Sequence, residues 1–458
     1  MSKISINDTI VAPATPAGVG AIALIRVSGR DAISLVAEIF RGKDLRKQES
    51  HTVHFGTIRN ESNGIIDEVL VSVFREPRSF TKENLVEISC HGSPYIVSQI
   101  LQILVKKGAR MAEAGEFTKR AFLNGQFDLA QAEAVADLIA SDSQAAHQIA
   151  INQMRGGFSK KIKDLREELI RFAALVELEL DFAEEDVEFA NRNELKGFLN
   201  NVLSYVNELL NSFQLGNVLK NGIPTVIVGK PNAGKSTLLN ALLNEEKAIV
   251  SDIAGTTRDS IEDEIILEGI RFRFIDTAGL RETQDQIEAI GVERAKKKIQ
   301  EASLVLYIFD ATSSQISEIQ IVEKELQELA KPYFLIFNKI DKLAEEELAF
   351  FQNFKNSICI AAKEQKGMER LQNALLSVVK DRKVKTGDVV INNLRHFEAL
   401  ALTKKSLEKV LEDIDSQITT DLLAMDIREA ISHLGSIVGE VTNEDLLDYI
   451  FSKFCIGK

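Results

Sequence analysis

Cysteine and long apolar runs are scarce in this 458-residue sequence, and each shortage excludes a class of protein. The three cysteines, Cys90, Cys359 and Cys455, cannot form a paired disulfide framework, and they lack the spacing of a zinc site. No stretch reaches the roughly 20 apolar residues that span a bilayer. The polar first residues do not resemble a signal peptide. We therefore expect a cytoplasmic protein with no membrane segment.

The sequence also lacks an excess of positive charge. It has 55 Lys and Arg against 68 Asp and Glu, for a formal net charge of −13. This balance works against broad attraction to RNA or to anionic membranes. Contact with RNA would need a local basic patch or a partner that carries the RNA. Lys160, Lys161 and Lys163 are one such run, although runs of this kind more often form a solvated helix face.

The chain length predicts about three domains, and the sequence pattern changes along it accordingly. Residues 1–119 alternate short apolar runs with turn signals, which predicts a mixed α/β domain. Within it, 21–27 and 69–74 have the composition of strands, and 93–107 has helical spacing.

Helical patterns follow in two separate segments, 120–219 and 385–458. The first contains a long apolar stripe that predicts core packing: Ile162, Leu165, Leu169, Phe172, Val176 and Leu180. Between the two segments, residues 220–384 alternate helices with continuous apolar runs, which are typical of buried parallel strands. These runs are 225–228, 272–275, 304–309 and 333–337. We expect a doubly wound α/β domain inserted into a discontinuous helical domain.

A glycine-rich loop follows the first strand of the inserted domain. Residues 229–236 read Gly-Lys-Pro-Asn-Ala-Gly-Lys-Ser and match the phosphate-binding pattern GxxxxGK[ST]. Its glycines let backbone N–H groups turn towards phosphate oxygens, Lys235 adds positive charge, and the Ser236 hydroxyl can bind Mg²⁺. The residues we expect at the phosphates are Asn232, Ala233, Gly234, Lys235, Ser236 and Thr237.

A second motif predicts that the base is guanine. Asn338-Lys339-Ile340-Asp341 follows the strand that ends at Phe337. The Asp341 carboxylate can accept two hydrogen bonds from the N1–H and N2–H₂ edge of guanine, whereas adenine offers no matching donors. Residues Ala361, Ala362 and Lys363 fall where related domains cup the guanine. Many of those domains have serine first, so Ala361 offers backbone contacts only.

A third motif lies between these two and predicts magnesium and γ-phosphate contacts. It comprises Asp276, Thr277, Ala278 and Gly279. Asp276 can hold Mg²⁺ through water, the Gly279 N–H can meet the γ-phosphate, and Thr257 would complete the Mg²⁺ shell.

The residue after this motif leaves the hydrolytic step open. Ras-type enzymes place there a glutamine that orients the attacking water, but this chain has Leu280. Four downstream acids could orient the water instead: Glu282, Asp285, Glu288 and Glu293. The Asn232 amide could hold a monovalent cation in place of an arginine finger, although asparagine also suits loop geometry without any ion.

Further segments, outside the nucleotide motifs, make nearly the whole chain resemble one family, the MnmE (TrmE) tRNA-modification GTPases. These segments are Asp-Thr-Ile-Val-Ala at 8–12, Gly-Glu-Phe-Thr-Lys-Arg-Ala-Phe-Leu-Asn at 115–124, Asp-Leu-Ala-Gln-Ala-Glu-Ala at 128–134 and the terminal Phe-Cys-Ile-Gly-Lys at 454–458. The resemblance implies an N-terminal domain, 1–119, that binds folate and dimerises. It also implies a helical domain built from 120–219 and 385–458, and an inserted Ras-like GTPase domain, 220–384.

The resemblance also implies a reaction and its partners. A homodimer would act with an FAD-dependent protein, MnmG (GidA), on the wobble uridine (U34) of certain tRNAs. It would add an aminomethyl or carboxymethylaminomethyl group at C5 of that base. A tetrahydrofolate derivative, in its 5-formyl or 5,10-methylene form, would supply the one-carbon unit. GTP hydrolysis, activated by K⁺, would drive association of the GTPase domains.

Position by position, the resemblance implies roles that spacing alone did not assign. The K⁺ ligands would be Asn232, Ser251, Ile253 and Thr256. Ser236 and Thr257 would hold Mg²⁺, and Glu288 would orient the attacking water. The positions implied for folate are Arg26, Glu87, Lys458 and Gln126, where the family often has lysine.

The cysteine near the end of the chain has competing interpretations. Cys455 could be a packed thiol, and the resemblance implies a functional thiol near the folate. Gly457 and Lys458 fit a prenylation signal badly, so lipidation is excluded. A rival function for the whole chain is a regulatory GTPase that scaffolds ribosomes or membranes. That alternative explains neither the terminal Cys-Ile-Gly-Lys nor the N-terminal domain.

Overall fold

The computed structural model describes residues 8–181, 192–245, 263–275, 298–329, 331–380, 390–416, 420–442 and 444–457. The chain divides into two compact units. The first unit contains residues 1–140, 151–203 and 399–458, and the second contains 141–150 and 204–398. Two of the divisions fall inside long helices, so the domain limits predicted above remain predictions.

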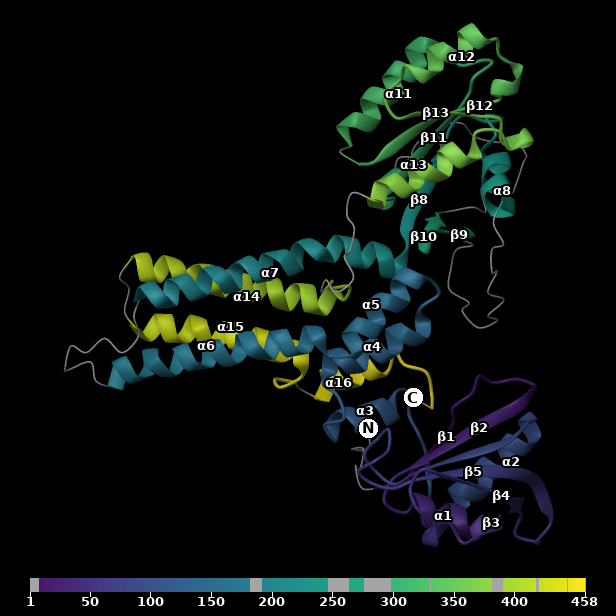
Figure 1. Cartoon of the computed structure of the whole chain (residues 1–458), viewed down its shortest axis with the longest axis vertical. Helices are drawn as coiled ribbons and strands as arrows, with labels where there is room; N and C mark the ends of the chain where they lie inside the picture. Colours follow the sequence, from purple (N-terminus) through teal and green to yellow (C-terminus); the bar gives the residue numbers. More distant parts are fainter. Residues whose placement is uncertain are drawn as a thin grey trace. The chain divides into compact units, whose positions relative to one another are not determined.

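The first unit begins with a seven-stranded sheet in the order β3-β4-β5-β6-β2-β1-β7 (Figure 1). Its strands are β1 Ile10–Pro13, β2 Gly20–Ser28, β3 Phe40–Arg41, β4 Thr52–Arg59, β5 Ile65–Phe74, β6 Leu85–Gly92 and β7 Arg110–Met111. Two helices accompany the sheet, α1 Ala32–Ile39 and α2 Pro94–Lys106. The predicted α/β character is confirmed, since strands and a helix occupy the expected segments.

Only one face of this sheet is covered by α1 and α2. Alternate residues of β2, β5 and β6, such as Ile25, Val71 and Ile88, are buried in one core with both helices. The opposite face carries Phe55, which is 66% exposed, and Leu70 directly across from it in the neighbouring strand. This face therefore leaves large apolar side chains exposed to solvent.

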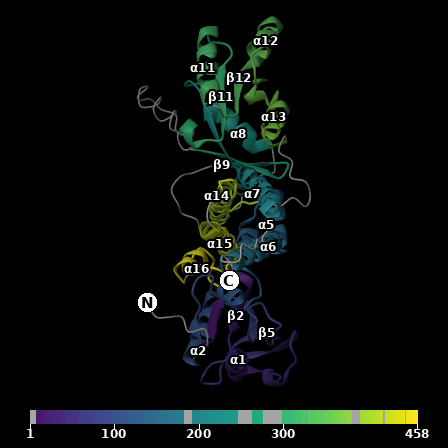
Figure 2. The same ribbon diagram turned by 90° about the vertical axis from the view of Figure 1, so that its left-hand side faces the viewer.

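The remainder of the first unit is helical. Its helices are α3 Glu116–Leu123, α4 Leu129–Ala140, part of α5 Gln144–Met154, α6 Gly157–Asp181, part of α7 Arg192–Asn221, part of α14 Leu394–Asp415, α15 Thr420–Val438 and α16 Glu444–Phe451. Helices α6 and α15, far apart in sequence, lie side by side in both views (Figures 1 and 2). The predicted apolar stripe forms part of this packing, because Ile162, Leu169 and Val176 are fully buried. The discontinuous helical part predicted from the sequence is thus confirmed.

The second unit contains a six-stranded sheet in the order β13-β12-β11-β8-β10-β9. Its strands are β8 Ile223–Val228, β9 Asp263–Leu267, β10 Ile270–Phe274, β11 Leu304–Asp310, β12 Tyr333–Asn338 and β13 Ser357–Ile360. Neighbouring strands run parallel, except that β9 is antiparallel to β10. All four predicted apolar runs form strands of this sheet.

Helices cover both faces of the second sheet. They are α8 Lys235–Glu245, α11 Ile316–Glu328, α12 Glu345–Gln352 and α13 Met368–Lys380. One core holds Leu238 of α8 and Leu371 of α13, and the other holds Val322 of α11 and Phe351 of α12. This is the doubly wound arrangement expected from the sequence. Among the described helices, none is long and apolar enough to cross a bilayer.

Candidate functional site

The predicted nucleotide motifs meet at one edge of the second sheet. Strands β8, β11, β12 and β13 are parallel, and their carboxyl ends lead into Gly229, Ala311, Lys339 and Ala361 respectively. Ligands of open α/β sheets bind in the crevice outside these ends. The fold therefore brings together motifs that are more than 100 residues apart in the sequence.

The phosphate loop between β8 and α8 needs glycine at both glycine positions of its motif, Gly229 and Gly234. A Cβ atom at Gly229 would lie 2.2 Å from the Ile308 carbonyl oxygen, and one at Gly234 would lie 2.2 Å from Asn338 Nδ2. Gly234 also has a φ of +102°, and Asn232 has a φ of +61°. The loop thus bends sharply and packs closely against β11 and β12.

Lys235, the first residue of α8, curls back over this loop. Its Nζ donates hydrogen bonds to the carbonyl oxygens of Gly229 and Lys230, each at 2.8 Å. Burial lowers the pKa of the Lys235 ammonium. The ammonium is thereby held beside the N-terminus of a helix, where the backbone dipoles also favour an anion. Ser236 and Thr237 occupy the next two positions of the same turn.

Asn338 connects the phosphate loop to the loop predicted to cup the base. Its Nδ2 donates to the Ala233 carbonyl oxygen at 2.9 Å, and its Oδ1 accepts from the Ala362 backbone N–H at 3.1 Å. The side chain is only 3% exposed. Asn338 is therefore a positioning residue that joins the phosphate loop to the loop containing Ala362. Lys363 is exposed beside the buried Ala361 and Ala362.

Lys339 connects the phosphate loop to the end of β11, through Asp310, which the sequence analysis did not predict. Its Nζ donates to the Asn232 carbonyl oxygen at 2.9 Å and to Asp310 Oδ2 at 2.5 Å. Burial raises the pKa of Asp310, but hydrogen bonds from Lys339 and Thr312 outweigh it and leave the pKa below its ordinary value. The sequence feature that could have identified Asp310 is its position as an acidic residue at the carboxyl end of the buried strand β11. Asp341 lies exposed in the single turn Ile340–Lys342.

The other predicted nucleotide and metal positions lie outside the described residues. They are Ser251, Ile253, Thr256, Thr257, Asp276, Thr277, Ala278, Gly279 and Glu288. Among the described residues, Ser236, the predicted magnesium ligand, lies in the first turn of α8. The Asn232 side chain lies exposed in the phosphate loop.

A second candidate site lies in the first unit, on the open face of the N-terminal sheet. Arg26 of β2 and Glu87 of β6 are cross-strand partners, and Glu87 Oε1 accepts from both Nε and Nη2 of Arg26, at 3.0 and 2.8 Å. The guanidinium lies over the Phe80 and Phe117 rings, 5.4 and 5.7 Å from their centroids. Neither aromatic residue was predicted, because no sequence periodicity marks them.

The C-terminal tail reaches this pair. Arg26 Nη1 donates to the Gly457 carbonyl oxygen at 3.3 Å, and Ile456 pairs with Ala114 in an isolated β-bridge. Gly457 has a φ of +92°, and a Cβ there would lie 2.1 Å from the Pro13 carbonyl oxygen. Only glycine fits at that point of the tail. The structure therefore brings Arg26 and Glu87 together with the last described residue, which precedes Lys458.

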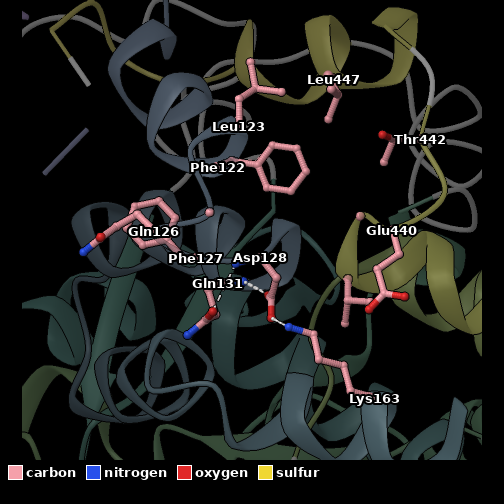
Figure 3. A pocket seen from close by; sticks show the side chains of 13 residues that line it. Phe122, Leu123, Gln126, Phe127, Asp128, Gln131, Lys163, Glu440, Thr442 and Leu447 are labelled. Atoms are coloured by element: carbon pink, nitrogen blue, oxygen red, sulfur yellow. Dashed lines mark hydrogen bonds and ion pairs between the residues drawn. The ribbon is translucent and has the colours of Figure 1, made fainter. Parts of the chain in front are cut away.

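Two other predicted residues of the first unit have different surroundings. The Cys455 thiol is exposed, while its carbonyl oxygen accepts from the Gly115 backbone N–H at 3.3 Å. Gln126 follows α3 and lines a cleft. Phe127 also lines the cleft (Figure 3), and its ring packs on that of Phe80 with centroids 5.7 Å apart.

A buried charged cluster supports the helix under the tail. Arg120 is 2% exposed, and it donates to Glu116, Asp8 and Glu83. Arg110 Nη2 donates to the same Glu116 carboxylate at 2.6 Å. Burial raises the pKa of Glu116, but the hydrogen bond from Arg110 and the other bonds outweigh it, so the net pKa is lowered. The cluster ties the start of α3 to the N-terminal sheet.

Comparison with known proteins gives consistent matches along the chain. The family described as "GTP-binding protein TrmE N-terminus" matches residues 9–126, and the one described as "MnmE helical domain" matches 129–455. The tRNA modification GTPase MnmE of Cytophaga hutchinsonii is 56% identical over 452 residues, covering 99% of this chain and 98% of the relative. That of Flavobacterium psychrophilum is 52% identical over 463 residues, covering 99% of each.

Solved structures match part of the chain. A structure of Era with MgGDPNP and a segment of 16S ribosomal RNA is 28% identical over 40% of this chain and 66% of that chain, with a TM-score of 0.26.

Proposed function

This chain belongs to the MnmE (TrmE) family of tRNA modification GTPases, and from that premise we propose that it couples GTP hydrolysis in its second unit to modification of the wobble uridine of tRNA in its first. The chain is a GTP-binding GTPase. The observation that best supports the proposed modification is the position of the C-terminal tail. Its Gly457 carbonyl oxygen accepts a hydrogen bond from Arg26, which is paired with Glu87. A GTP switch alone would not require that connection.

In the proposed nucleotide site, the residues of this chain bind and orient GTP. Lys235 exchanges its two carbonyl contacts for the outer phosphates, and Asp341 accepts from the guanine edge. Ser236 and Thr257 hold Mg²⁺, which neutralises phosphate charge when bound. Asn232, Ser251, Ile253 and Thr256 hold K⁺, which supplies the charge that an arginine finger supplies elsewhere.

The proposed hydrolytic water is oriented by Glu288, the one of the four downstream acids to which the family resemblance assigns this role, since Leu280 cannot form a hydrogen bond. The remaining nucleotide contacts come from the loops containing Thr277 and Ala362. The buried Asn338 side chain supports the proposed nucleotide site, since its two hydrogen bonds join the phosphate loop to the loop that contains Ala362. Preorganised groups of this kind cost no rearrangement when charge develops on the phosphates.

The proposed folate site is the Arg26–Glu87 pair with the tail. Glu87 Oε1 takes both Arg26 bonds, which leaves Oε2 available to the N–H groups of a pteridine ring. Phe80 and Phe117 provide flat apolar surfaces beside the guanidinium. Lys458 and Gln126 complete the site for a 5-formyl- or 5,10-methylene-tetrahydrofolate, with Cys455 as a functional thiol nearby.

We place the homodimer contact on the open face of the N-terminal sheet. Ile22 and Phe55 are each 66% exposed there, and Arg26 and Glu87 belong to the same face. Burying this apolar area against a second copy would also enclose the folate site. The FAD-dependent MnmG would join this dimer in acting on tRNA.

Reconstitution tests the proposal directly. The chain, the flavoprotein, unmodified tRNA, GTP, K⁺ and a tetrahydrofolate donor are combined, and the wobble nucleoside is identified by mass spectrometry. We expect a C5-modified uridine that is absent when GTP or the folate is omitted. A matched reaction with Arg26→Gln should lose the product while GTP turnover continues. An unmodified nucleoside in the complete mixture, with active GTP turnover, would favour a purely regulatory GTPase.

A further inference from the structure

Asp310 lies beside the nucleotide site, but none of the proposed nucleotide contacts involves it. It ends β11, which lies between β8, the strand before the phosphate loop, and β12, the strand before the guanine motif (Figure 1). Lys339 Nζ joins its carboxylate to that loop, since it donates to Asp310 Oδ2 at 2.5 Å and to the Asn232 carbonyl oxygen at 2.9 Å. By charge alone, a carboxylate at this place would disfavour a nucleotide.

The Asp310 carboxylate is held in one orientation by its own neighbours. Its Oδ1 accepts from the Thr312 backbone N–H at 3.0 Å and from the Thr312 hydroxyl at 2.6 Å, which leaves Oδ2 for the Lys339 ammonium. The side chain of Asp310 is only 19% exposed. A lysine ammonium on its flexible stem has no preferred direction of its own. The fixed carboxylate therefore aims the Lys339 ammonium at the Asn232 carbonyl oxygen.

Two successive carbonyl groups of the phosphate loop are held in this way from the end of β12. Lys339 holds that of Asn232, and Asn338 Nδ2 donates to that of Ala233 at 2.9 Å. In a trans peptide, the N–H of the next residue points away from the carbonyl oxygen. The two bonds therefore turn the N–H groups of Ala233 and Gly234 to the opposite side of the loop.

That opposite side is the inside of the loop, where an anion would be received. The Lys230 carbonyl oxygen accepts there from the Ala233 N–H at 3.4 Å and from Lys235 Nζ at 2.8 Å. The N–H group and the ammonium thus point to one place, as phosphate binding requires. Asn232 and Lys339 have φ angles of +61° and +68°, which are uncommon outside glycine, and the bond between them helps to hold both.

We propose that Asp310 is a positioning residue for binding of the β-phosphate of the nucleotide. It directs Lys339, which holds the Asn232 carbonyl group outward, and the same peptide then presents the Ala233 N–H to the phosphate. Asp310 itself contacts no phosphate, and its charge is offset by Lys339. The inference rests on the proposed nucleotide site and deepens it, because it assigns this carboxylate to phosphate binding and not to recognition of the base.

The affinities for GDP and GMP test this assignment, because GMP retains the base but lacks the β-phosphate. They are measured on the full chain with Mg²⁺ by calorimetry, with GMP in competition against GDP. We expect Asp310→Asn to weaken GDP binding about tenfold and to leave GMP binding nearly unchanged. Charge alone predicts the opposite sign, since the substitution removes a negative charge. Glu328→Gln, at an exposed acid of α11, removes the same charge as a matched control and should alter neither affinity.

Two further variants show whether Asp310 acts through Lys339. Thr312→Val removes one of the bonds that orient the carboxylate, so it should cause a smaller loss with the same preference for GDP over GMP. Lys339→Met should itself weaken GDP more than GMP. Adding Asp310→Asn to Lys339→Met should then change the ratio little further, because the ammonium that the carboxylate directs is gone.

Three outcomes would overturn the assignment. GDP affinity that is unchanged or higher in Asp310→Asn would show that the carboxylate does not position the loop. Equal losses for GDP and GMP would indicate general damage to the site. Fully additive losses in the double variant would mean that Asp310 acts on a group other than Lys339. A parent chain that binds no GDP would instead remove the proposed nucleotide site itself.

Discussion

The two candidate sites are built in opposite ways. In the described part of the nucleotide site, the functional groups belong to short motifs that follow a buried parallel strand, as the motif of Lys235 follows β8 and that of Asp341 follows β12. In the tail site, Arg26, Glu87 and Gly457 come from three distant parts of the chain, and the pair of charges lies within strands rather than after them. One site is local in sequence and the other is assembled by the fold.

This difference affects what holds each site in place. The phosphate loop is held by backbone geometry, by two glycines with no room for a Cβ, and by the Asn338 bridge. The tail site depends on the docking of three residues, 455–457, against the N-terminal sheet and the start of α3. We therefore expect single substitutions to disable one site and leave the other intact, which the following experiments examine.

The largest effect is expected for Lys235→Met. Removing the ammonium deletes the positive charge at the outer phosphates, so GTP turnover should fall about a thousandfold. Steady-state phosphate release measures it, and folate binding by calorimetry should be unchanged. Lys230→Met is the matched control on the same loop, because Lys230 is exposed and pairs with Glu318 at 2.6 Å. Equal losses in both variants would contradict a specific role for Lys235.

A smaller effect is expected from the proposed cation. GTP turnover in KCl should exceed that in NaCl at equal ionic strength by about tenfold or more, because Asn232 would help to hold K⁺ against the phosphates. Asn232→Ala should remove most of this difference while GTP affinity stays nearly normal. Asn353→Ala, at the end of α12, serves as the control. Identical rates in the two salts would remove the cation from the mechanism.

The same contrast explains how far the sequence could predict each site. Four of the six strands of the second unit, β8, β10, β11 and β12, and the phosphate-binding motif at 229–236 were predictable, because a continuous apolar run followed by a fixed glycine spacing admits few structures. Arg26 and Glu87 were assigned only through the family resemblance. Their support, the Phe80 and Phe117 rings and the buried Arg120, depends on long-range packing that has no local period in the sequence. Asp310 differs, because its position at the end of a buried strand is visible in the sequence and only its contact with Lys339 of the neighbouring strand end depends on the fold.

Gly457→Ala tests whether the tail site is as fragile as its construction indicates. The added Cβ would collide with the Pro13 carbonyl oxygen, and the positive φ would be strained, so the tail should leave Arg26. We expect folate affinity to fall about tenfold by calorimetry, with GTP turnover unchanged. Ser452→Ala, just after α16, is the control close to the same end. Full folate affinity in Gly457→Ala would separate the tail from the folate site.

The smallest effect concerns the carboxylate that anchors α3. Glu116 has a lowered folded-state pKa, so its contribution to stability is fully present above the ordinary glutamate value of 4.5 and is lost as pH falls through the lowered value. The free energy of unfolding of the first unit should therefore decline with acidification below about pH 4.5.

Glu116→Gln should be less stable near neutral pH and show a flatter decline, because no proton is taken up there. Glu113→Gln, which replaces an exposed neighbouring acid, should follow the parent curve. Parallel curves for Glu116→Gln and the parent would show that other carboxylates carry the acid response. The tail site would then owe its support to packing of α3 rather than to this ion pair.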